Sequence, residues 1–324
     1  MTNISRTFSG IAAALLLLSL GSPTACASAN SHSHSHESEE FSPVFSPAVP
    51  ESMTFCGDRV NLDRTDMYER LDRELTSLCY THGNTLLTIK RANRYFPMMA
   101  PILKKNGVPL DILYLACIES TLNPRALSGA RAAGLWQFMP DTGRQYGLEV
   151  NDYVDERYHP EKATEAACRY LKKAYSKYGN WESVAASYNG GMGRISGELD
   201  KQIANSAYDL YLADETTRYM FRLLATKIIM ENPARYGYRL TDDQLYQPFE
   251  YDEVTVGAPV DDWALWAKRQ GINYLILREH NPWIRAKSLP NKDGKTYIVK
   301  IPKKESLKRS SQKKKTYNSN WTVK

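Results

Sequence analysis

Between residues 60 and 235 the apolar side chains recur every three or four positions, and this spacing constrains the fold of the chain more than any other feature. The longest run follows His159-Pro160 and keeps helical spacing for five turns before Gly179. Its apolar positions are Ala163, Ala166, Ala167, Tyr170, Leu171, Ala174, Tyr175 and Tyr178. No convincing two-residue alternation interrupts this region, so we expect an all-α domain over residues 56–245.

Other helices are marked by their ends. We expect helices from Asp66 onward, over residues 82–106, from Pro109 onward and over residues 215–230, because apolar residues repeat at helical spacing there. Proline suits the first turn of a helix, and glycine suits the position after the last turn. Asn180 is expected to cap the helix that ends at Gly190-Gly191.

The pattern changes after residue 250. Two short alternating runs, Val254–Val256 and Thr296–Ile301, flank two helical segments, which predicts a small βααβ module over residues 250–303. Residues 304–324 are basic and poor in apolar side chains, and we expect them to be disordered. Of the net charge of +6, +7 lies in residues 303–324, so the rest of the chain carries −1. A nucleic-acid-binding face on the folded body is therefore not expected.

The N-terminus has the features of an export signal. Ile11–Leu20 is an apolar run of ten residues, whereas a membrane-spanning helix needs about 20. We therefore assign residues 1–29 to a signal peptide. Cleavage after Ala29 and lipidation of Cys26 are both open, so the protein is expected in the periplasm or anchored to a membrane of the cell envelope. Residues 30–55, rich in Ser, His and Pro, are expected to form a disordered tether without a metal site.

Four further cysteines, Cys56, Cys79, Cys117 and Cys168, are either paired or buried as free thiols. The chain has no HExxH, GxxxxGK[ST] or GxSxG motif, which argues against three common kinds of catalytic or nucleotide site.

One carboxyl residue has unusual sequence neighbours. Glu119 ends the apolar segment Leu113–Ile118, and apolar surroundings raise the pKa of a carboxyl group. A carboxylic acid that stays protonated near neutral pH can donate a proton to a leaving sugar oxygen. A helix-terminal glutamate facing water is the alternative.

Four sequence segments, taken in their order along the chain, favour a catalytic Glu119 over a glutamate that only faces water. They read IESTLNPRALS over 118–128, GARAAGLWQFMP over 129–140, AASYNGG over 185–191 and DETTRY over 214–219. In order and spacing they resemble the four motifs of the lytic murein transglycosylases, all-α enzymes related in fold to goose-type lysozyme. The resemblance covers roughly residues 60–240. It implies a mainly α chain with a lysozyme-like catalytic domain and a small α+β module.

The resemblance also implies roles for single residues. Glu119 matches the catalytic acid and base, and the matched substrate-binding positions are Ser120, Gln137, Tyr188, Asn189 and Tyr219. The implied reaction cleaves the β-1,4 bond between N-acetylmuramic acid and N-acetylglucosamine. Glu119 protonates the leaving oxygen and then, as carboxylate, takes the proton of the 6-hydroxyl, which closes a 1,6-anhydro ring. No water, metal or organic cofactor is needed. Asp141, Asp152 and Asp155 remain alternatives for a second carboxylate.

The C-terminal module resembles a degenerate LysM repeat in its βααβ order, in Asn281 and in Ile301-Pro302. Glycan binding and a purely structural role are both open for it, and Trp263, Trp266 and Trp283 either stack on sugars or fill its core. We expect a monomer that binds peptidoglycan glycan strands, with membrane attachment through a lipidated Cys26 as an alternative to free secretion. A lysozyme-type hydrolase and a non-catalytic peptidoglycan-binding scaffold are the competing functions.

Overall fold

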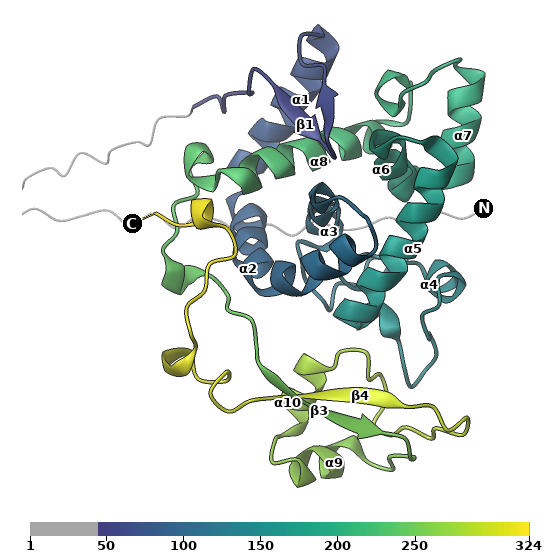
Figure 1. Ribbon diagram of the computed structural model, residues 1–324, viewed down its shortest axis with the longest axis vertical. Coiled ribbons are helices and arrows are strands. Elements are labelled where there is room, and N and C mark those ends of the chain that lie inside the picture. The colour runs from purple at the N-terminus through teal and green to yellow at the C-terminus, as the bar shows by residue number, and fades with distance from the viewer. Residues whose placement is uncertain (1–44, 324) are drawn as a thin grey trace, which may run out of the picture. The chain divides into compact units, whose positions relative to one another are not determined.

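The computed structural model describes residues 45–323. The expected signal peptide, Cys26 and residues 30–44 of the expected tether lie outside the described residues. Residues from Ser46 onward form one unit, in which a helical domain precedes a small two-stranded module (Figure 1). None of the helices in residues 45–323 has the length and apolar character needed to cross a membrane.

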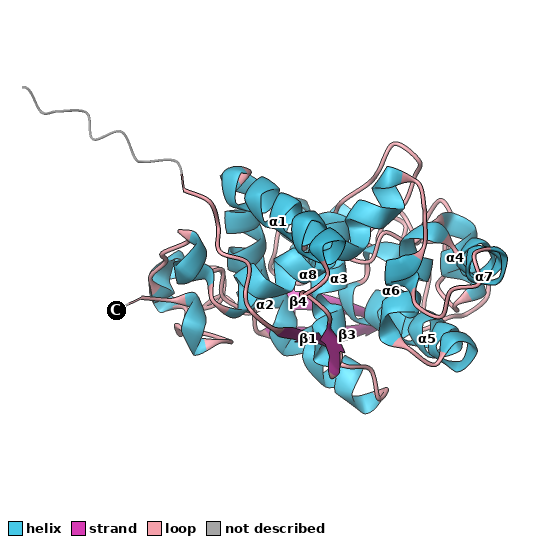
Figure 2. Ribbon diagram, turned by 90° about the horizontal axis from the view of Figure 1, so that it is seen from above, coloured by secondary structure: helices cyan, strands magenta, loops and turns pink. Residues whose placement is uncertain are grey.

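The helical domain begins with a short hairpin and continues almost entirely in helices (Figure 2). The hairpin strands are β1 (Met53–Phe55) and β2 (Asp58–Val60). The α-helices are α1 (Thr65–Tyr80), α2 (His82–Lys105), α3 (Leu113–Ser120), α4 (Pro140–Gln145), α5 (Pro160–Tyr178), α6 (Trp181–Gly190), α7 (Met192–Lys201) and α8 (Asp214–Glu231). Single 3₁₀ turns lie at Leu110–Ile112, Glu156–Tyr158, Ala207–Asp209, Pro233–Tyr236 and Asp242–Gln244.

The helix ends that the sequence marks most strongly are confirmed. Pro160 occupies the first turn of α5, and Gly179 follows the last turn with a left-handed φ of 70°. The side chain of Asn180 then accepts a hydrogen bond from the Ser183 amide at 2.9 Å, which caps α6. These short-range signals fix where α5 stops and how closely α6 follows it.

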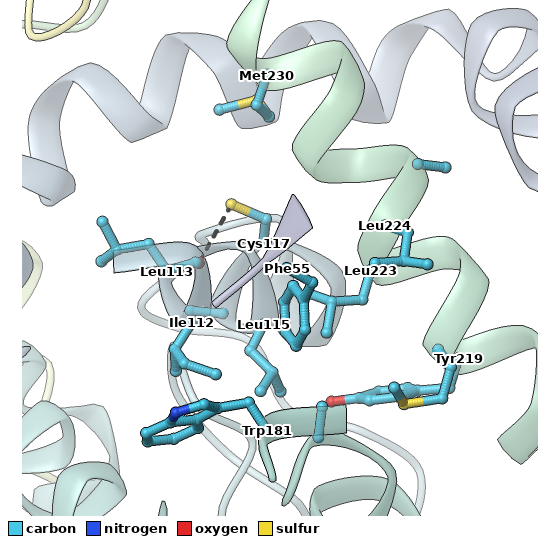
Figure 3. Packing of buried hydrophobic residues seen from close by; sticks show 14 of the residues in the cluster. Phe55, Ile112, Leu113, Leu115, Cys117, Trp181, Tyr219, Leu223, Leu224 and Met230 are labelled. Carbon is cyan, nitrogen blue, oxygen red and sulfur yellow. Dashed lines mark hydrogen bonds between the residues drawn. The ribbon is translucent and has the colours of Figure 1, made fainter. Parts of the chain in front are cut away.

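Helix α8 passes across the middle of the domain and contacts α1, α3 and α6 (Figure 1). Its apolar residues face those of α3, and Figure 3 shows Leu115 and Cys117 of α3 near Leu223 and Leu224 of α8. Phe55 of β1 points into the same cluster and is 2% exposed. Because α8 packs against helices on several sides, the positions of its polar side chains are tightly restricted.

The C-terminal module has the βααβ order that the sequence predicts. Strands β3 (Tyr251–Val256) and β4 (Tyr297–Pro302) pair antiparallel, and α9 (Trp263–Arg269) and α10 (Tyr274–His280) lie between them in the chain. All three module tryptophans, Trp263, Trp266 and Trp283, are buried in its core. They therefore fill the core of the module, and Trp283 also lines a cavity at its border with the helical domain.

Asn281 is fully buried and joins α10 to the sheet. Its amide donates to the carbonyl oxygens of Leu277 and Lys300, and its carbonyl oxygen accepts from the Lys300 amide at 2.8 Å. The residue that carries part of the LysM resemblance thus has a structural role in this module.

Two expectations about disorder are wrong over the described residues. The end of the expected tether, residues 53–55, forms strand β1, and Phe55 is buried in the core. The basic tail, residues 304–323, is ordered and includes the 3₁₀ turns Arg309–Ser311 and Ser319–Trp321. It runs back to the helical domain, where Trp321 is 2% exposed. Phe55 and Trp321 each bury a large apolar ring in the helical domain, and this burial favours an ordered segment. The average composition of the two segments does not reveal it.

All four cysteines of the described residues are unpaired. Cys79, Cys117 and Cys168 are buried, and Cys56 is partly buried. The alternative of buried thiols therefore holds for this structure, and the disulfide alternative does not.

Candidate active site

Glu119 is the next-to-last residue of α3, whose other side chains are mostly apolar and buried. The helix ends abruptly because Thr121 and Leu122 both adopt left-handed backbone angles, with φ of 50° and 54°. This conformation is costly for residues with a Cβ, and a branched residue such as Thr121 pays most. Arg91 of α2 holds the turn by donating to the carbonyl and hydroxyl oxygens of Thr121, each at 3.1 Å.

Tyr219 of α8 contacts the carboxyl group of Glu119. Its hydroxyl donates a hydrogen bond to Oε1 of Glu119 at 2.6 Å, although the two residues are 100 positions apart in the sequence. Tyr219 is 3% exposed. Burial and the neighbouring carboxyl raise the pKa of Tyr219 well above its usual value, so its hydroxyl keeps its proton. The tyrosine therefore acts as a fixed hydrogen-bond donor to Glu119.

Burial raises the pKa of Glu119 from its usual 4.5 to about 7. The hydrogen bond from Tyr219 and the positive charge of Arg222 oppose this rise, because both favour the carboxylate. Desolvation is the larger effect. The carboxyl is thus balanced near neutral pH, where it can both give and take a proton.

Arg222 lies one turn after Tyr219 on α8 and belongs to a charged cluster that the sequence analysis missed. Glu74 of α1 is 1% exposed and accepts from Nε of Arg218 at 2.8 Å. Its other oxygen lies 3.7 Å from Nε of Arg222. The sequence holds one signal for this cluster, because Glu74 interrupts the apolar stripe of α1 beside Leu71 and Leu75. A buried carboxylate in such a stripe needs a cationic partner.

The segment Gly134–Pro140 forms a tight turn beside α3. Gly134 has a φ of 78°, and a Cβ there would lie 1.8 Å from the carbonyl oxygen of Arg157. Only glycine fits this position. Gln137, which the resemblance places in the sugar groove, has a φ of 49°, and its amide nitrogen donates to the Gly134 carbonyl at 2.9 Å. The side-chain NH2 group of Gln137 is thus hydrogen-bonded within the turn itself.

Ser120 is buried, and its hydroxyl points to the carbonyl oxygens of Ala116 and Leu135, at 3.1 and 2.9 Å. The expected substrate contact of Ser120 is not what this geometry favours, because its hydroxyl proton is used inside the protein. The residue instead links the end of α3 to the Gly134–Pro140 turn.

Tyr188 and Asn189 lie near the end of α6. The ring of Tyr188 packs among Trp136, Phe138 and Tyr170, and its hydroxyl donates to the Trp136 carbonyl at 2.7 Å. The charge of Glu119 contributes to the raised pKa of Tyr188, which puts the two residues in the same site. Asn189 is exposed.

The three aspartates considered as a second carboxylate differ in their surroundings. Asp155 is buried in an ion pair with Arg157, at 2.7 Å, and Asp141 is exposed and paired with Arg144. Asp152 is exposed. Within residues 45–323 no cluster of three or more His, Cys, Asp or Glu residues is suited to hold a metal ion.

The structure therefore brings Glu119, Tyr188 and Tyr219 together, with Ser120 and Gln137 holding the adjoining turn. Glu119, Tyr188 and Tyr219 line none of five cavities found on the surface of residues 45–323. A sugar groove at Glu119 therefore stays a prediction.

Family models match both parts of the chain. Residues 98–210 match the transglycosylase SLT domain, and residues 252–305 match the soluble lytic transglycosylase C-terminal LysM-like domain. The expectation of a mainly α chain, with a helical domain followed by a small α+β module, is confirmed.

Curated relatives carry related names. The chain is 31% identical over 262 residues to membrane-bound lytic murein transglycosylase D of Escherichia coli (strain K12), covering 78% of this chain and 56% of the relative. It is 30% identical over 175 residues to membrane-bound lytic murein transglycosylase C of Glaesserella parasuis serovar 5, covering 46% of this chain and 47% of the relative. The chain thus spans about half the length of these relatives.

Among solved structures, the 70 kDa soluble lytic transglycosylase of Escherichia coli is 22% identical, with a TM-score of 0.36. The match covers 55% of this chain and 33% of that one.

Proposed function

Because the chain contains an SLT transglycosylase domain followed by a LysM-like domain, we propose that it is a lytic transglycosylase of peptidoglycan. It cleaves the β-1,4 bond between N-acetylmuramic acid and N-acetylglucosamine and leaves a 1,6-anhydro-muramic end. The observation that carries this proposal is the Glu119–Tyr219 pair, in which a carboxyl with a pKa of about 7 accepts a hydrogen bond from a buried tyrosine.

One carboxyl group serves both chemical steps in this proposal. The protonated form of Glu119 donates its proton to the oxygen of the leaving N-acetylglucosamine. The resulting carboxylate then accepts the proton of the muramic 6-hydroxyl while that oxygen attacks C1 and closes the ring. The proton count balances without water, and the proton gained in the second step restores the acid. A pKa near 7 suits a group that must work in both directions.

Neighbouring residues keep the carboxyl in place. Tyr219 fixes its orientation, and Ser120 with the Gly134–Pro140 turn fixes the end of α3. Asn189 is exposed and is proposed to bind the N-acetyl sugars, together with the edge of Tyr188 and the amide oxygen of Gln137. We further propose that the protein acts in the cell envelope, held there through a lipidated Cys26 or released after cleavage of the signal peptide.

The product identifies the reaction. Purified peptidoglycan digested with the protein is expected to give muropeptides that are lighter by one water than hydrolytic products, as measured by mass spectrometry. Fully hydrated ends would assign the protein to the lysozyme-type hydrolases instead. No released product at all would favour a non-catalytic scaffold that binds peptidoglycan.

Turnover is expected to fall as the pH rises through about 7, because only the protonated form of Glu119 can start the reaction. Tyr219→Phe removes a hydrogen bond that lowers the pKa of Glu119, so the midpoint of this fall should move to higher pH. The measurement is the initial rate of product release over roughly pH 5 to pH 9, an interval that brackets the pKa of Glu119.

Tyr178→Phe is the control for this substitution, because the Tyr178 hydroxyl donates to the Met192 carbonyl and not to Glu119. Its pH profile should match that of the unaltered protein. A midpoint that moves to lower pH in Tyr219→Phe would contradict the assigned hydrogen bond.

A further inference from the structure

A cavity of about 380 Å³ lies between the helical domain and the LysM-like domain, and Glu119 is not among the residues that line it. Its walls on the SLT side come from α2, from Pro124 and from the start of α5. Its walls on the other side come from residues 248–251, the end of α10 and β4. This volume falls in the range of about 300–1,000 Å³ that is usual for small-ligand sites, and such sites often lie between domains.

Contacts around the cavity hold its two sides together. Lys300 of β4 forms an ion pair with Glu161 at the start of α5. Arg125 pairs with Glu279 of α10 at 3.2 Å. The Asp155 amide donates to the carbonyl oxygen of Trp283 at 2.9 Å. Because these links join the two domains on several sides, the cavity is a fixed feature of the junction.

Arg94 of α2 lines this cavity and has no anionic partner. Its Nε donates to the Gln247 carbonyl at 3.0 Å, and its guanidinium lies over the rings of Phe249 and Tyr246, at 4.6 and 5.2 Å from their centres. Within residues 45–323 no carboxylate forms an ion pair with it. The guanidinium is therefore held in place by aromatic stacking and by a hydrogen bond with the Tyr95 side chain, and its charge is not matched by a carboxylate.

The other acidic groups and the lysine of the cavity have partners. Glu161 pairs with Lys300 and also lies 3.2 Å from Nδ1 of His159, and Glu279 pairs with Arg125. Burial lowers the pKa of His280 to about 4, so its imidazole is neutral, and Nδ1 contacts the Tyr251 hydroxyl at 3.1 Å. The cavity thus presents one unpaired cation among apolar and aromatic walls that include Phe249.

We propose that this cavity binds a carboxylate of a peptidoglycan stem peptide, with the Arg94 guanidinium as its anion partner. This inference rests on the proposed function, because it takes peptidoglycan as the substrate. Stem peptides carry free carboxylates next to short aliphatic groups, whereas the glycan backbone is uncharged and rich in hydroxyl groups. A cation between proline, methionine and phenylalanine side chains suits the peptide. The LysM-like domain then contributes to substrate recognition through its junction with the SLT domain.

The test is isothermal titration of the full chain with N-acetyl-L-alanyl-D-glutamate and, separately, with its uncharged diamide. We expect binding of the acid and binding of the diamide that is weaker by about ten-fold or more, because a charge-assisted hydrogen bond is lost. Arg94→Gln should weaken binding of the acid by a similar factor. Met98→Trp fills the cavity without changing its charge and should abolish binding of both probes.

Lys90→Gln is the matched control, since Lys90 is a cation one turn earlier on α2 that does not line this cavity. It should leave the affinity unchanged. Each variant is checked by its unfolding temperature, so that a loss of binding is separated from a loss of fold. Equal affinity for acid and diamide, unchanged affinity in both Arg94→Gln and Met98→Trp, or no binding of the acid would overturn the proposal. Anhydro products without peptide binding would refute the cavity assignment alone, and peptide binding without anhydro products would refute the proposed reaction alone.

Discussion

Replacing Glu119 by glutamine is expected to slow the release of anhydro muropeptides from purified peptidoglycan by at least about a thousand-fold. General acid–base catalysis contributes on the order of 10²–10⁴ in rate, and in the proposed reaction one residue supplies both the acid and the base. Glutamine keeps the shape of the side chain and can still accept the hydrogen bond from Tyr219. It has no proton to donate to the leaving oxygen. The measurement is the rate of product release, followed by liquid chromatography and mass spectrometry.

The same substitution should not weaken the fold. The pKa of Glu119 is raised from 4.5 to about 7, so between these values the folded protein holds a proton that the unfolded chain has lost. The free energy of unfolding therefore falls as the pH rises from 4.5 to 7, by on the order of 3 kcal/mol. Glutamine cannot ionise and avoids this loss. Glu119→Gln should thus be at least as stable as the unaltered protein at pH 8, as measured by urea unfolding.

Glu69→Gln is the control, because Glu69 is an exposed carboxyl group on α1. Its rate of product release and its stability at pH 8 should both match those of the unaltered protein. If Glu119→Gln kept most of its activity while it remained folded, the acid of the reaction would have to be another residue. If it were inactive and clearly less stable at pH 8, loss of fold would explain the inactivity, and the burial assigned to Glu119 would be wrong.

Much of the candidate site follows from the sequence because its motifs are local. Glu119 stands out as a carboxyl at the end of an apolar segment, and Gly134 and Gly190 mark turns in the chain. The contact between Tyr219 and Glu119 spans 100 residues, and only the packing of α8 against α3 creates it. The motif resemblance implied both residues and put the tyrosine against the catalytic carboxyl, and the structure adds the direction and the length of the hydrogen bond.

Other features of the site depend on side-chain direction, which spacing does not indicate. The hydroxyl of Ser120 points inward to Leu135, and the amide nitrogen of Gln137 returns to its own turn. Arg222 acts on Glu119 from the next turn of α8, held near Glu74 of α1. Only the carboxylate of Glu74 within an apolar stripe gave a sequence signal for this cluster.

The fold, like the site, has parts that follow from local sequence signals and parts that depend on contacts between distant residues. Pro160, Gly179 and Asn180 act on their immediate neighbours, so the ends of α5 and α6 can be read from the sequence. The tail, in contrast, is ordered by contacts with residues that lie far away in the sequence. Its lysines and serines are typical of a disordered segment, whereas its two aromatic residues, Tyr317 and Trp321, both pack against Phe96 of α2.

Several contacts fasten this tail to the helical domain. The indole nitrogen of Trp321 donates to the Met230 carbonyl at 2.6 Å, and its ring packs against Phe96 with the centroids 5.7 Å apart. The Val323 amide donates to the Leu240 carbonyl at 2.8 Å. Asn93 of α2 accepts from the Tyr317 amide at 2.8 Å. The chain that leaves the LysM-like domain at β4 is therefore held against the helical domain along the length of residues 317–323.

Trp321→Ala is expected to lower the free energy of unfolding by about 3–5 kcal/mol, the usual cost of removing a large buried ring. Trp321→Phe should cost less, about 1–3 kcal/mol, because it keeps most of the ring but leaves the Met230 carbonyl unpaired. The measurement is urea unfolding followed by far-ultraviolet circular dichroism, which reports on the helices and not on the altered ring. Lys313→Ala, an exposed position in the same tail, should leave the unfolding midpoint unchanged. Equal midpoints for Trp321→Ala and Lys313→Ala would mean that the tail is free in solution and that the core of the helical domain is complete without it.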